Sequence, residues 1–159
     1  MTAGGEAGHT PIRMAAPSPG TDKSCEAGNV TTPRSVLVVD DQAPFRLAAK
    51  AVLRRLDGFE LAGEATSARE AIELVDSLRP ALVLMDIHMP DMDGIEATRR
   101  ILAAHPDVVV FLCSSYDVAD LPPDAAASGA SGYHNKEQFG VGTLCRLWAE
   151  RAPGSFATC

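Results

Sequence analysis

Short apolar runs alternate with helix-period patterns along residues 35–151, and this alternation constrains the fold more than any other feature of the chain. The runs are four to seven residues long, the usual length of a strand. Apolar residues at helical spacing follow them, such as Phe45, Ala49 and Leu53 after the first run. Five strands alternating with five helices predict a parallel sheet with helices on both faces. The predicted strands are 36–39, 59–65, 81–86, 108–113 and 131–136.

The five predicted strands differ in apolar character, and this difference orders them in the sheet. The first, third and fourth are continuously apolar, whereas the second and fifth are mixed. Central strands of a parallel sheet are covered on both faces, so they carry continuous apolar runs. The pattern predicts a flavodoxin-like, doubly wound (βα)5 fold with strand order 2-1-3-4-5. Its ligand crevice is expected at the carboxyl ends of the first and third strands.

Two further signals refine the helices. Ser67 and Glu70 form a Ser-x-x-Glu capping-box pattern before the second predicted helix. In the fourth helical segment, Pro122 and Pro123 cannot lie in a helix interior. If Pro123 takes the first helical position and Gly129 ends the helix, only about two turns remain. We therefore expect a shortened fourth helix and an altered surface around it.

Composition predicts one acidic domain with polar extensions. The chain has 159 residues, of which 46% are apolar, and its formal charge of −7 argues against a surface built for nucleic acid or anionic lipid. Residues 1–34 are rich in Gly and Pro and lack apolar periodicity, so we expect a disordered tail there. The folded domain is expected at 35–152, with a short tail at 153–159. The chain shows no membrane-spanning run or signal-peptide core, which predicts a cytoplasmic location.

The four cysteines show no CxxC pairing and no metal-ligand spacing. Cys113 lies in an apolar run and Cys145 in a helical pattern, where cysteine behaves as a small apolar residue. We therefore expect neither a disulfide framework nor a zinc site.

Polar residues follow four of the predicted strands at the same end. Asp40 and Asp41 follow the first strand, and Asp86 ends the third. Ser114 follows the fourth strand, and Lys136 ends the fifth. Because clustered carboxylates repel one another unless cations offset their charge, Lys136 and a divalent metal ion are expected beside them. An all-oxygen site of this kind suits Mg²⁺ better than zinc or copper.

Each of these residues, taken alone, also has an ordinary structural explanation. Asp86 could begin a turn, and Asp40 and Asp41 could form a turn that caps the next helix. Ser114 could be a loop serine, and Lys136 could be a solvated lysine on an edge strand.

Four segments carry a resemblance to a known family: Val-Leu-Val-Val-Asp-Asp at 36–41, Leu-Met-Asp-Ile-His-Met-Pro-Asp-Met-Asp-Gly at 84–94, Ser-Ser-Tyr at 114–116 and Gly-Tyr-His-Asn-Lys at 132–136. In this order, and close to these spacings, they are typical of response-regulator receiver domains in two-component signalling. Residues 35 to about 152 therefore resemble a CheY-like receiver domain. Because the chain stops at Cys159, we expect a single-domain regulator or a degenerate relative of a multidomain one, which does not itself bind nucleic acid.

The resemblance implies how a phosphoryl group would be handled. Asp86 would accept the group from a histidine kinase, and Lys136 would pair with one phosphoryl oxygen. The Ser114 hydroxyl would bond another oxygen. Tyr133 matches the aromatic position that changes rotamer with phosphorylation, so Ser114 and Tyr133 would form the switch.

The resemblance also implies a cofactor and partners. Mg²⁺ would be held by four groups, namely Asp40, Asp41, Asp86 and the carbonyl of His88. Besides the kinase, an unknown downstream protein is expected as a partner, and a homodimer is left open. The chain is not expected to be an enzyme beyond its own phosphorylation and dephosphorylation. Tyr116 and His88 occupy positions that tune hydrolysis in this family, and we expect Tyr116 to screen the acyl phosphate from water.

Two other functions are weighed against this one. The domain could be a receiver-like binding module that acts without phosphorylation, although the complete set of polar residues favours a phosphoacceptor. The segment Asp91-Met92-Asp93-Gly94 is similar to the Asp-x-Asp-Gly motif of haloacid-dehalogenase-type phosphatases. In those enzymes the first Asp ends an apolar strand, whereas Asp91 follows Pro90 in a turn, so a loop and a helix cap are expected here instead.

Overall fold

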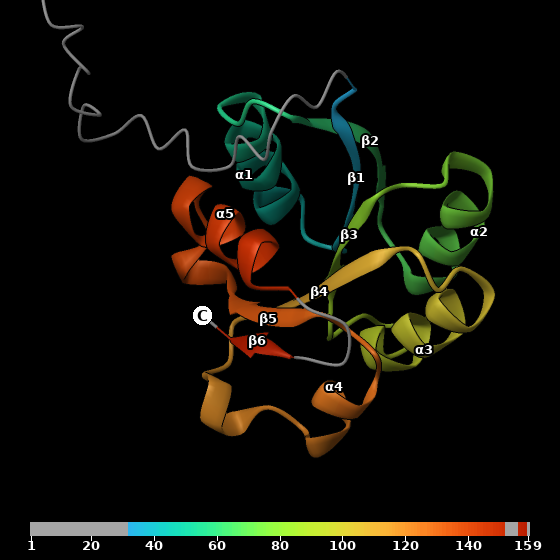
Figure 1. Ribbon diagram of the computed structural model, residues 1–159. Coiled ribbons are helices and arrows are strands. Elements are labelled where there is room, and N and C mark those ends of the chain that lie inside the picture. Colours follow the sequence, from blue (N-terminus) through green and yellow to red (C-terminus); the bar gives the residue numbers. More distant parts are fainter. Residues whose placement is uncertain (1–31, 152–155, 159) are drawn as a thin grey trace, which may run out of the picture.

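A parallel six-stranded sheet lies between two layers of helices in the computed structural model, which describes residues 32–151 and 156–158 (Figure 1). The strand order is β2-β1-β3-β4-β5-β6, so the predicted order of the first five strands is confirmed. In chain order the elements are β1 (Arg34–Val39), α1 (Ala43–Arg54), β2 (Phe59–Ala65), α2 (Ala68–Leu78), β3 (Leu82–Asp86), α3 (Gly94–Ala104), β4 (Val109–Ser114), the 3-10 helix η2 (Val118–Asp120), α4 (Pro123–Ala127), β5 (Gly132–Asn135), the 3-10 helix η3 (Lys136–Gln138), α5 (Val141–Glu150) and β6 (Ala157–Thr158).

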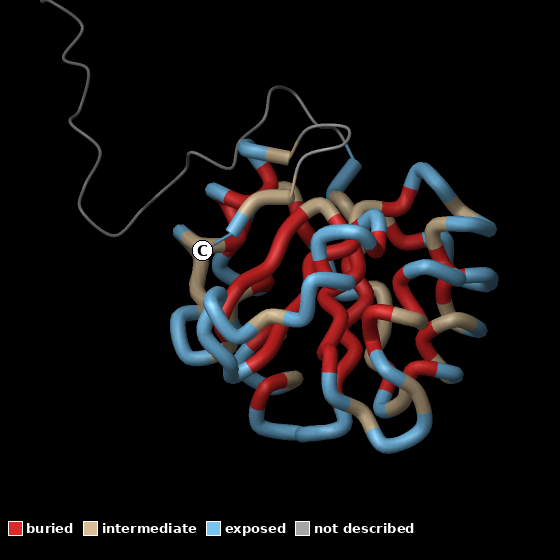
Figure 2. Tube along the Cα trace, turned by 90° about the horizontal axis from the view of Figure 1, so that it is seen from below, coloured by how far each residue is buried: buried red, intermediate tan, exposed pale blue. Residues whose placement is uncertain are grey.

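The core consists of two apolar layers, one on each face of the sheet. Alternate residues of a strand point to opposite faces, so Leu37 and Val39 pack on the side of α2, α3 and α4, while Val36 and Val38 pack on the side of α1 and α5. Every residue of β3 is buried, as expected of a central strand. Figure 2 shows that the interior of the domain is buried, whereas the outer loops and the outward sides of the helices are exposed. The polar strand ends are therefore held on a rigid frame.

Side chains cap the N-termini of α2 and α3. The Ser67 hydroxyl accepts from the Glu70 amide at 3.1 Å, as the capping box predicts. The Glu70 carboxylate instead accepts from the Thr66 amide, one residue earlier than in a capping box. The Asp91 carboxylate accepts from the amides of Ala68 and Arg69 at the start of α2, and Asp93 accepts from the Ile95 amide at the start of α3. The Asp91–Gly94 segment thus supplies a loop and helix caps, as predicted.

The proline pair shortens α4 as predicted. Pro123 is the first residue of this five-residue helix, and Pro122 is its N-cap. Gly129, with a φ of 92°, follows the helix in the left-handed region that glycine adopts readily. Because residues 118–120 form only a single 3-10 turn, the segment between β4 and β5 presents short helices and bends.

Two strand assignments differ from the sequence-based expectations. Arg34, assigned to the disordered tail, is the first residue of β1, and residues 1–31 lie outside the described residues. Ala157 and Thr158, assigned to the C-terminal tail, form β6 along β5. A two-residue strand has no periodicity that a sequence could display, and its pairing depends on the neighbouring strand edge. The rest of that tail, apart from Phe156, is outside the described residues.

The cysteine expectation is confirmed at one position and wrong at another. Cys113 is a free, fully buried thiol in β4. Cys145 is buried in α5 but is disulfide-bonded, so it is not simply a small apolar residue. Spacing alone could not reveal this bond, because disulfides join residues that approach in space.

Among the residues that the structure describes, no helix is both long and apolar enough to cross a membrane.

Candidate functional site

Four strands bring polar residues to one edge of the sheet. Asp40 and Asp41 directly follow β1, and Asp86 is the last residue of β3. Ser114 ends β4, and Lys136 follows β5. All these strands are parallel and in register, so their carboxyl ends are level. The convergence predicted from the sequence is therefore present.

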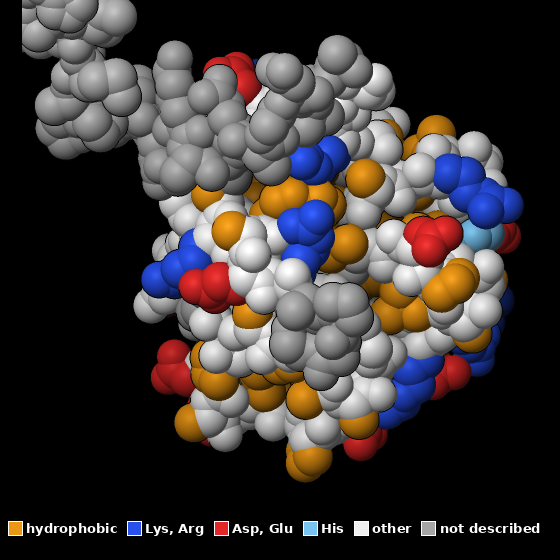
Figure 3. Space-filling view, in the orientation of Figure 1, with side chains coloured by type: hydrophobic (Ala, Val, Ile, Leu, Met, Phe, Trp, Pro, Cys, Tyr) orange, Lys and Arg blue, Asp and Glu red, His pale blue; other side chains and the backbone are white. Residues whose placement is uncertain are grey.

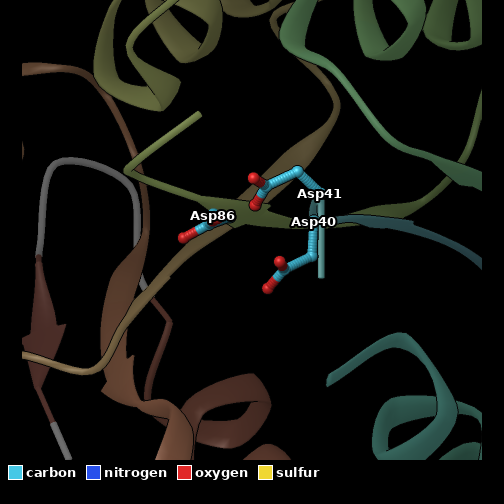
Figure 4. Close-up of side chains that lie close together, drawn as sticks. All are labelled: Asp40, Asp41 and Asp86. Atoms are coloured by element: carbon cyan, nitrogen blue, oxygen red, sulfur yellow. The ribbon is translucent and has the colours of Figure 1, made fainter. Parts of the chain in front are cut away.

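Three carboxylates lie close together at this edge (Figure 4). Asp40, Asp41 and Asp86 each offer an oxygen, and these oxygens lie within 4.8 Å of one another. Asp40 and Asp86 are buried, whereas Asp41 is exposed. The Gln42 amide donates to Asp40 Oδ1 at 2.8 Å, which orients that side chain. The cluster is thus a concentrated negative charge with one member open to solvent.

Lys136 joins two of these carboxylates. Its Nζ lies 2.5 Å from Asp40 Oδ2 and 3.1 Å from Asp86 Oδ1, and only 12% of its side chain is exposed. Burial alone would lower the pKa of Lys136, but its hydrogen bond to Asp40 and the charge of Asp86 outweigh burial and raise that pKa. The ammonium group therefore remains charged and partly neutralises the cluster.

The pKa of Asp86 is raised to about 6. Burial is the largest cause, because a low-dielectric environment disfavours the ionised carboxyl. The Lys136 charge opposes this effect, and the nearby Asp40 charge adds to it. The Asp86 carboxylate is therefore ionised at neutral pH but at a cost in free energy, which is typical of groups that carry chemistry.

Ser114 and Tyr133 connect the site to the loop after β4. The Ser114 hydroxyl accepts from the Tyr116 amide at 3.2 Å, and Ser114 is almost fully buried. Tyr133 is buried, and its hydroxyl donates toward the carbonyls of Ser114 and Tyr116. The Asn135 side chain also donates to the Tyr116 carbonyl, at 3.3 Å. The Tyr133 ring is thus turned inward and held by this loop.

Residues 36–145 match the family model described as "Response regulator receiver domain". The chain belongs to this family. Receiver domains of this family are parts of two-component systems. The converging residues all lie within 36–145, so they belong to the receiver domain. The predicted family resemblance is confirmed.

Two curated relatives illustrate the range of proteins that contain such a receiver domain. The chain is 38% identical over 100 residues to the chemotaxis protein CheY of Thermotoga maritima, covering 63% of this chain and 82% of that protein. It is 38% identical over 101 residues to the response regulator GacA of Pseudomonas viridiflava, covering 64% of this chain and 47% of that protein. The chain thus spans most of CheY but about half of GacA.

Solved receiver structures share the fold. The signal receiver domain of the putative response regulator NarL from Mycobacterium tuberculosis has a TM-score of 0.68 and 26% identity, covering 76% of this chain and 99% of that one. A two-component response regulator of the LuxR family from Aurantimonas sp. has a TM-score of 0.67 and 27% identity, and the match covers 77% of this chain and 91% of that one. These likenesses agree with the parallel sheet described above.

The carboxylate cluster of the receiver domain fits a divalent cation. It offers only oxygen ligands, and it is the one group of three or more acidic, His or Cys residues with metal-site spacing in the described part of the chain. Hard cations such as Mg²⁺ prefer this donor set. The predicted fourth ligand, the His88 carbonyl, remains a prediction. The His88 amide lies 3.4 Å from Asp86 Oδ1, and its ring packs edge-on against Tyr116 with centroids 4.9 Å apart.

The structure adds residues that the sequence reading missed. Gly94 packs so closely under the site that a Cβ there would lie 2.0 Å from the Asp86 carbonyl oxygen. Asn135 anchors the Tyr116 loop, as described above. His134 is fully buried, with Nε2 3.0 Å from Cys113 Sγ. In the sequence, the position of Gly94 directly after the cap of α3 was a visible signal. The contacts of Asn135 and His134 depend on tertiary packing.

Proposed function

We propose that this chain is a phosphoacceptor receiver in which Asp86 takes a phosphoryl group from a histidine kinase in a Mg²⁺-dependent reaction. The observation that supports this most strongly is the double contact of Lys136 with Asp40 and Asp86 inside the carboxylate cluster. A buried lysine so placed offsets negative charge where a further anionic group would arrive. A lysine on a solvated edge would make no such pair of contacts.

The proposed reaction is a direct transfer. An Asp86 oxygen attacks phosphorus, the bond between phosphorus and the kinase histidine nitrogen breaks, and the electron pair of that bond stays on the imidazole. The product is an acyl phosphate on Asp86. Lys136 holds the carboxylate and then pairs with a phosphoryl oxygen. Mg²⁺ held by Asp40, Asp41, Asp86 and the His88 carbonyl would neutralise charge on the transferring group.

The same residues suggest how the signal would spread. The Ser114 hydroxyl accepts from the Tyr116 amide, so a movement of Ser114 toward a phosphoryl oxygen would change its contact with that loop. That loop also holds the Tyr133 hydroxyl, so a change at Ser114 alters the environment of Tyr133. A population shift of this kind requires only that phosphate contacts favour one arrangement. We propose a cytoplasmic switch that catalyses only its own phosphorylation and dephosphorylation and reports to a downstream protein.

Incubation with acetyl phosphate and Mg²⁺ tests the proposal. The wild-type chain is expected to gain one phosphoryl group by intact mass, and Asp86→Asn is expected to gain none, because an amide is not a nucleophile for this transfer. Asp107→Asn is a matched control, since Asp107 is an exposed carboxylate far along the chain from the cluster.

Two outcomes would contradict the proposal. Equal phosphorylation of wild type and Asp86→Asn would place the acceptor elsewhere. A wild-type chain that gains no phosphate from acetyl phosphate or from a histidine kinase would favour the binding module that acts without phosphorylation.

Tyr116 is expected to slow the loss of the acyl phosphate. Tyr116 is 53% exposed, and its ring packs edge-on against His88, two residues after Asp86, where we expect it to hinder the approach of water. In Tyr116→Ala the phosphoryl lifetime is expected to fall about threefold or more, because water then reaches the site. Tyr116→Phe, which keeps the ring, and Val118→Ala, which truncates another exposed side chain nearby, are expected to retain the wild-type lifetime. An unchanged lifetime in Tyr116→Ala would refute this role.

A further inference from the structure

The ring of Phe45 lies beside the ammonium group of Lys136. Phe45 is a buried residue of α1, and Lys136 Nζ lies over its ring at 5.1 Å from the ring centroid. The same Nζ contacts Asp40 and Asp86, as described above. The ammonium group thus contacts two carboxylates and also faces an aromatic ring.

Lys136 has lost most of the water that usually surrounds a lysine. Figure 3 shows other Lys and Arg side chains on the outer surface of one face of the molecule, whereas the Lys136 side chain is only 12% exposed. An ammonium group has three N–H donors, and hydrogen bonds to Asp40 and Asp86 use two of them. The face of an aromatic ring attracts a cation, most strongly where water is excluded. The Phe45 ring therefore supplies an attraction that solvent no longer provides.

Two further aromatic rings fix the Phe45 ring in place. His134 in β5 stacks against it with centroids 6.4 Å apart, and Phe139 tilts against it with centroids 5.4 Å apart. His134 and Phe139 also stack on each other, with centroids 4.7 Å apart. His134 Nε2 lies 3.0 Å from the Sγ of Cys113, its partner in β4, so these rings are tied to the sheet. We call Phe45, His134 and Phe139 the aromatic cluster.

The aromatic cluster does not repel Lys136. His134 is fully buried, and burial lowers its pKa to about 4. Its imidazole is therefore neutral near pH 7 and adds no positive charge beside the ammonium group. Because Phe45 and Phe139 are uncharged as well, the cluster offers a ring face without an opposing charge.

Lys136 needs such support because its side chain is flexible. Lysine carries its charge on a four-carbon stem that has many rotamers. Lys136 is also the first residue of η3, which is only a single 3-10 turn of three residues. Since a misplacement of about 1 Å can slow a reaction greatly, the position of Nζ matters for any transfer to Asp86. An interaction that keeps Nζ beside Asp86 raises the fraction of molecules that are ready to react.

We propose that Phe45 is a positioning residue, which holds the Lys136 ammonium group beside Asp86 through the face of its aromatic ring. The effect on the reaction rests on the proposed function, in which Lys136 pairs with a phosphoryl oxygen. Phe45 itself does not touch the transferred group and acts only through Lys136. An apolar residue without a ring would fill the core at this position but would not attract the ammonium group, so positioning can be separated from packing.

Fluorinated phenylalanines placed at position 45 of the full-length chain test the proposal. Ring fluorines withdraw electron density from the ring face and change the side-chain volume little, so the attraction for a cation falls as fluorines are added. The same analogues at Phe139 are the matched control. Phe139 belongs to the aromatic cluster, but among the residues that the structure describes the Lys136 ammonium group faces only the Phe45 ring.

Two quantities are measured for each chain. The first is the rate of phosphorylation by acetyl phosphate with Mg²⁺. The second is the hydrogen exchange of the Lys136 ammonium group, measured by NMR in the unphosphorylated chain. The second quantity needs no phosphate, so it reports on Lys136 independently of the proposed function.

Both quantities are expected to change in step with fluorination at position 45. The phosphorylation rate is expected to fall about threefold or more for the fully fluorinated ring, because fewer molecules hold Nζ beside Asp86. Exchange of the ammonium group is expected to accelerate in the same order. Phe45→Leu, which is apolar but has no ring, is expected to behave like the fully fluorinated analogue. The analogues at position 139 are expected to match wild type in both measurements.

Three results would overturn the proposal. Ammonium exchange that does not depend on fluorination at position 45 would show that Phe45 only fills the core. Equal effects at positions 45 and 139 would show that the packing of the whole aromatic cluster matters instead. A constant phosphorylation rate despite faster exchange would show that holding Lys136 does not assist the transfer. If wild type gains no phosphate, the proposed function fails, and the exchange series still decides whether Phe45 holds Lys136.

Discussion

A Gly94→Ala variant is expected to lose about 3 kcal/mol or more of unfolding free energy, which is a large share of the stability of a small domain. A Cβ at this position would lie 2.0 Å from the Asp86 carbonyl oxygen and 3.0 Å from the Ile87 Cα. Both neighbours are backbone atoms, so no flexible side chain can move aside, and the chain next to the acceptor carboxylate must shift. Urea unfolding of purified variants measures the loss.

The chain offers an opposite control for this substitution. Gly142 lies in α5, and a Cβ there would meet nothing within 4 Å. Gly142→Ala is therefore expected to stabilise the domain by about 0.5–1 kcal/mol, through the higher helix propensity of alanine. Equal effects of the two substitutions would show that the close approach at Gly94 is not a constraint.

Stability is expected to respond to pH in opposite directions through His134 and Asp86. Burial lowers the pKa of His134 from 6.5 to about 4, and burial raises the pKa of Asp86 from 3.8 to about 6. Below pH 6.5 the unfolded chain protonates His134 while the folded chain does not, so this residue removes stability as pH falls toward 4. The ionised Asp86 carboxylate destabilises the fold. Protonation of Asp86 therefore raises the free energy of unfolding as pH falls from about 6 toward 3.8.

Variants separate the two contributions. From pH 7 to pH 5 we expect His134 to lower the free energy of unfolding by about 2 kcal/mol and Asp86 to raise it by about 1 kcal/mol, so these two groups together cost wild type about 1 kcal/mol. His134→Gln is then expected to become more stable at pH 5 than at pH 7. Asp86→Asn is expected to be more stable than wild type at pH 7 by about 2–3 kcal/mol and to lose stability on acidification.

Urea unfolding at a series of pH values, in the presence of a chelator, measures these differences. His105→Gln is a control, because it removes a histidine at the far end of α3 that is not in contact with the cluster. Parallel pH profiles for wild type and His134→Gln would show that His134 is not held neutral by the fold.

Much of the fold could be predicted because its signals are local. The strand boundaries predicted from apolar runs lie within two residues of those observed, and the short α4 follows from the geometry of Pro122 and Pro123. The positions of Asp86 and Lys136 also followed, because parallel strands that end together bring their next residues together. These inferences need only chain direction and steric rules.

Other features depended on contacts between distant segments. The Asp91 carboxylate caps α2 across 23 residues of sequence, and β6 exists only because an open β5 edge lies beside it. Neither produces a local pattern. The disulfide at Cys145 and the burial of His134 against Cys113 are of the same kind.

The sequence by itself therefore determined the parallel sheet, its first five strands and the residues that meet at its carboxyl edge. Only the tertiary structure decided the electrostatic state of that edge. The raised pKa of Asp86 and the two contacts of Lys136 arise from burial and from distances of a few ångströms. The physical reason is that strand and helix signals act over neighbouring residues, whereas desolvation and charge pairing depend on what the whole fold places around a group.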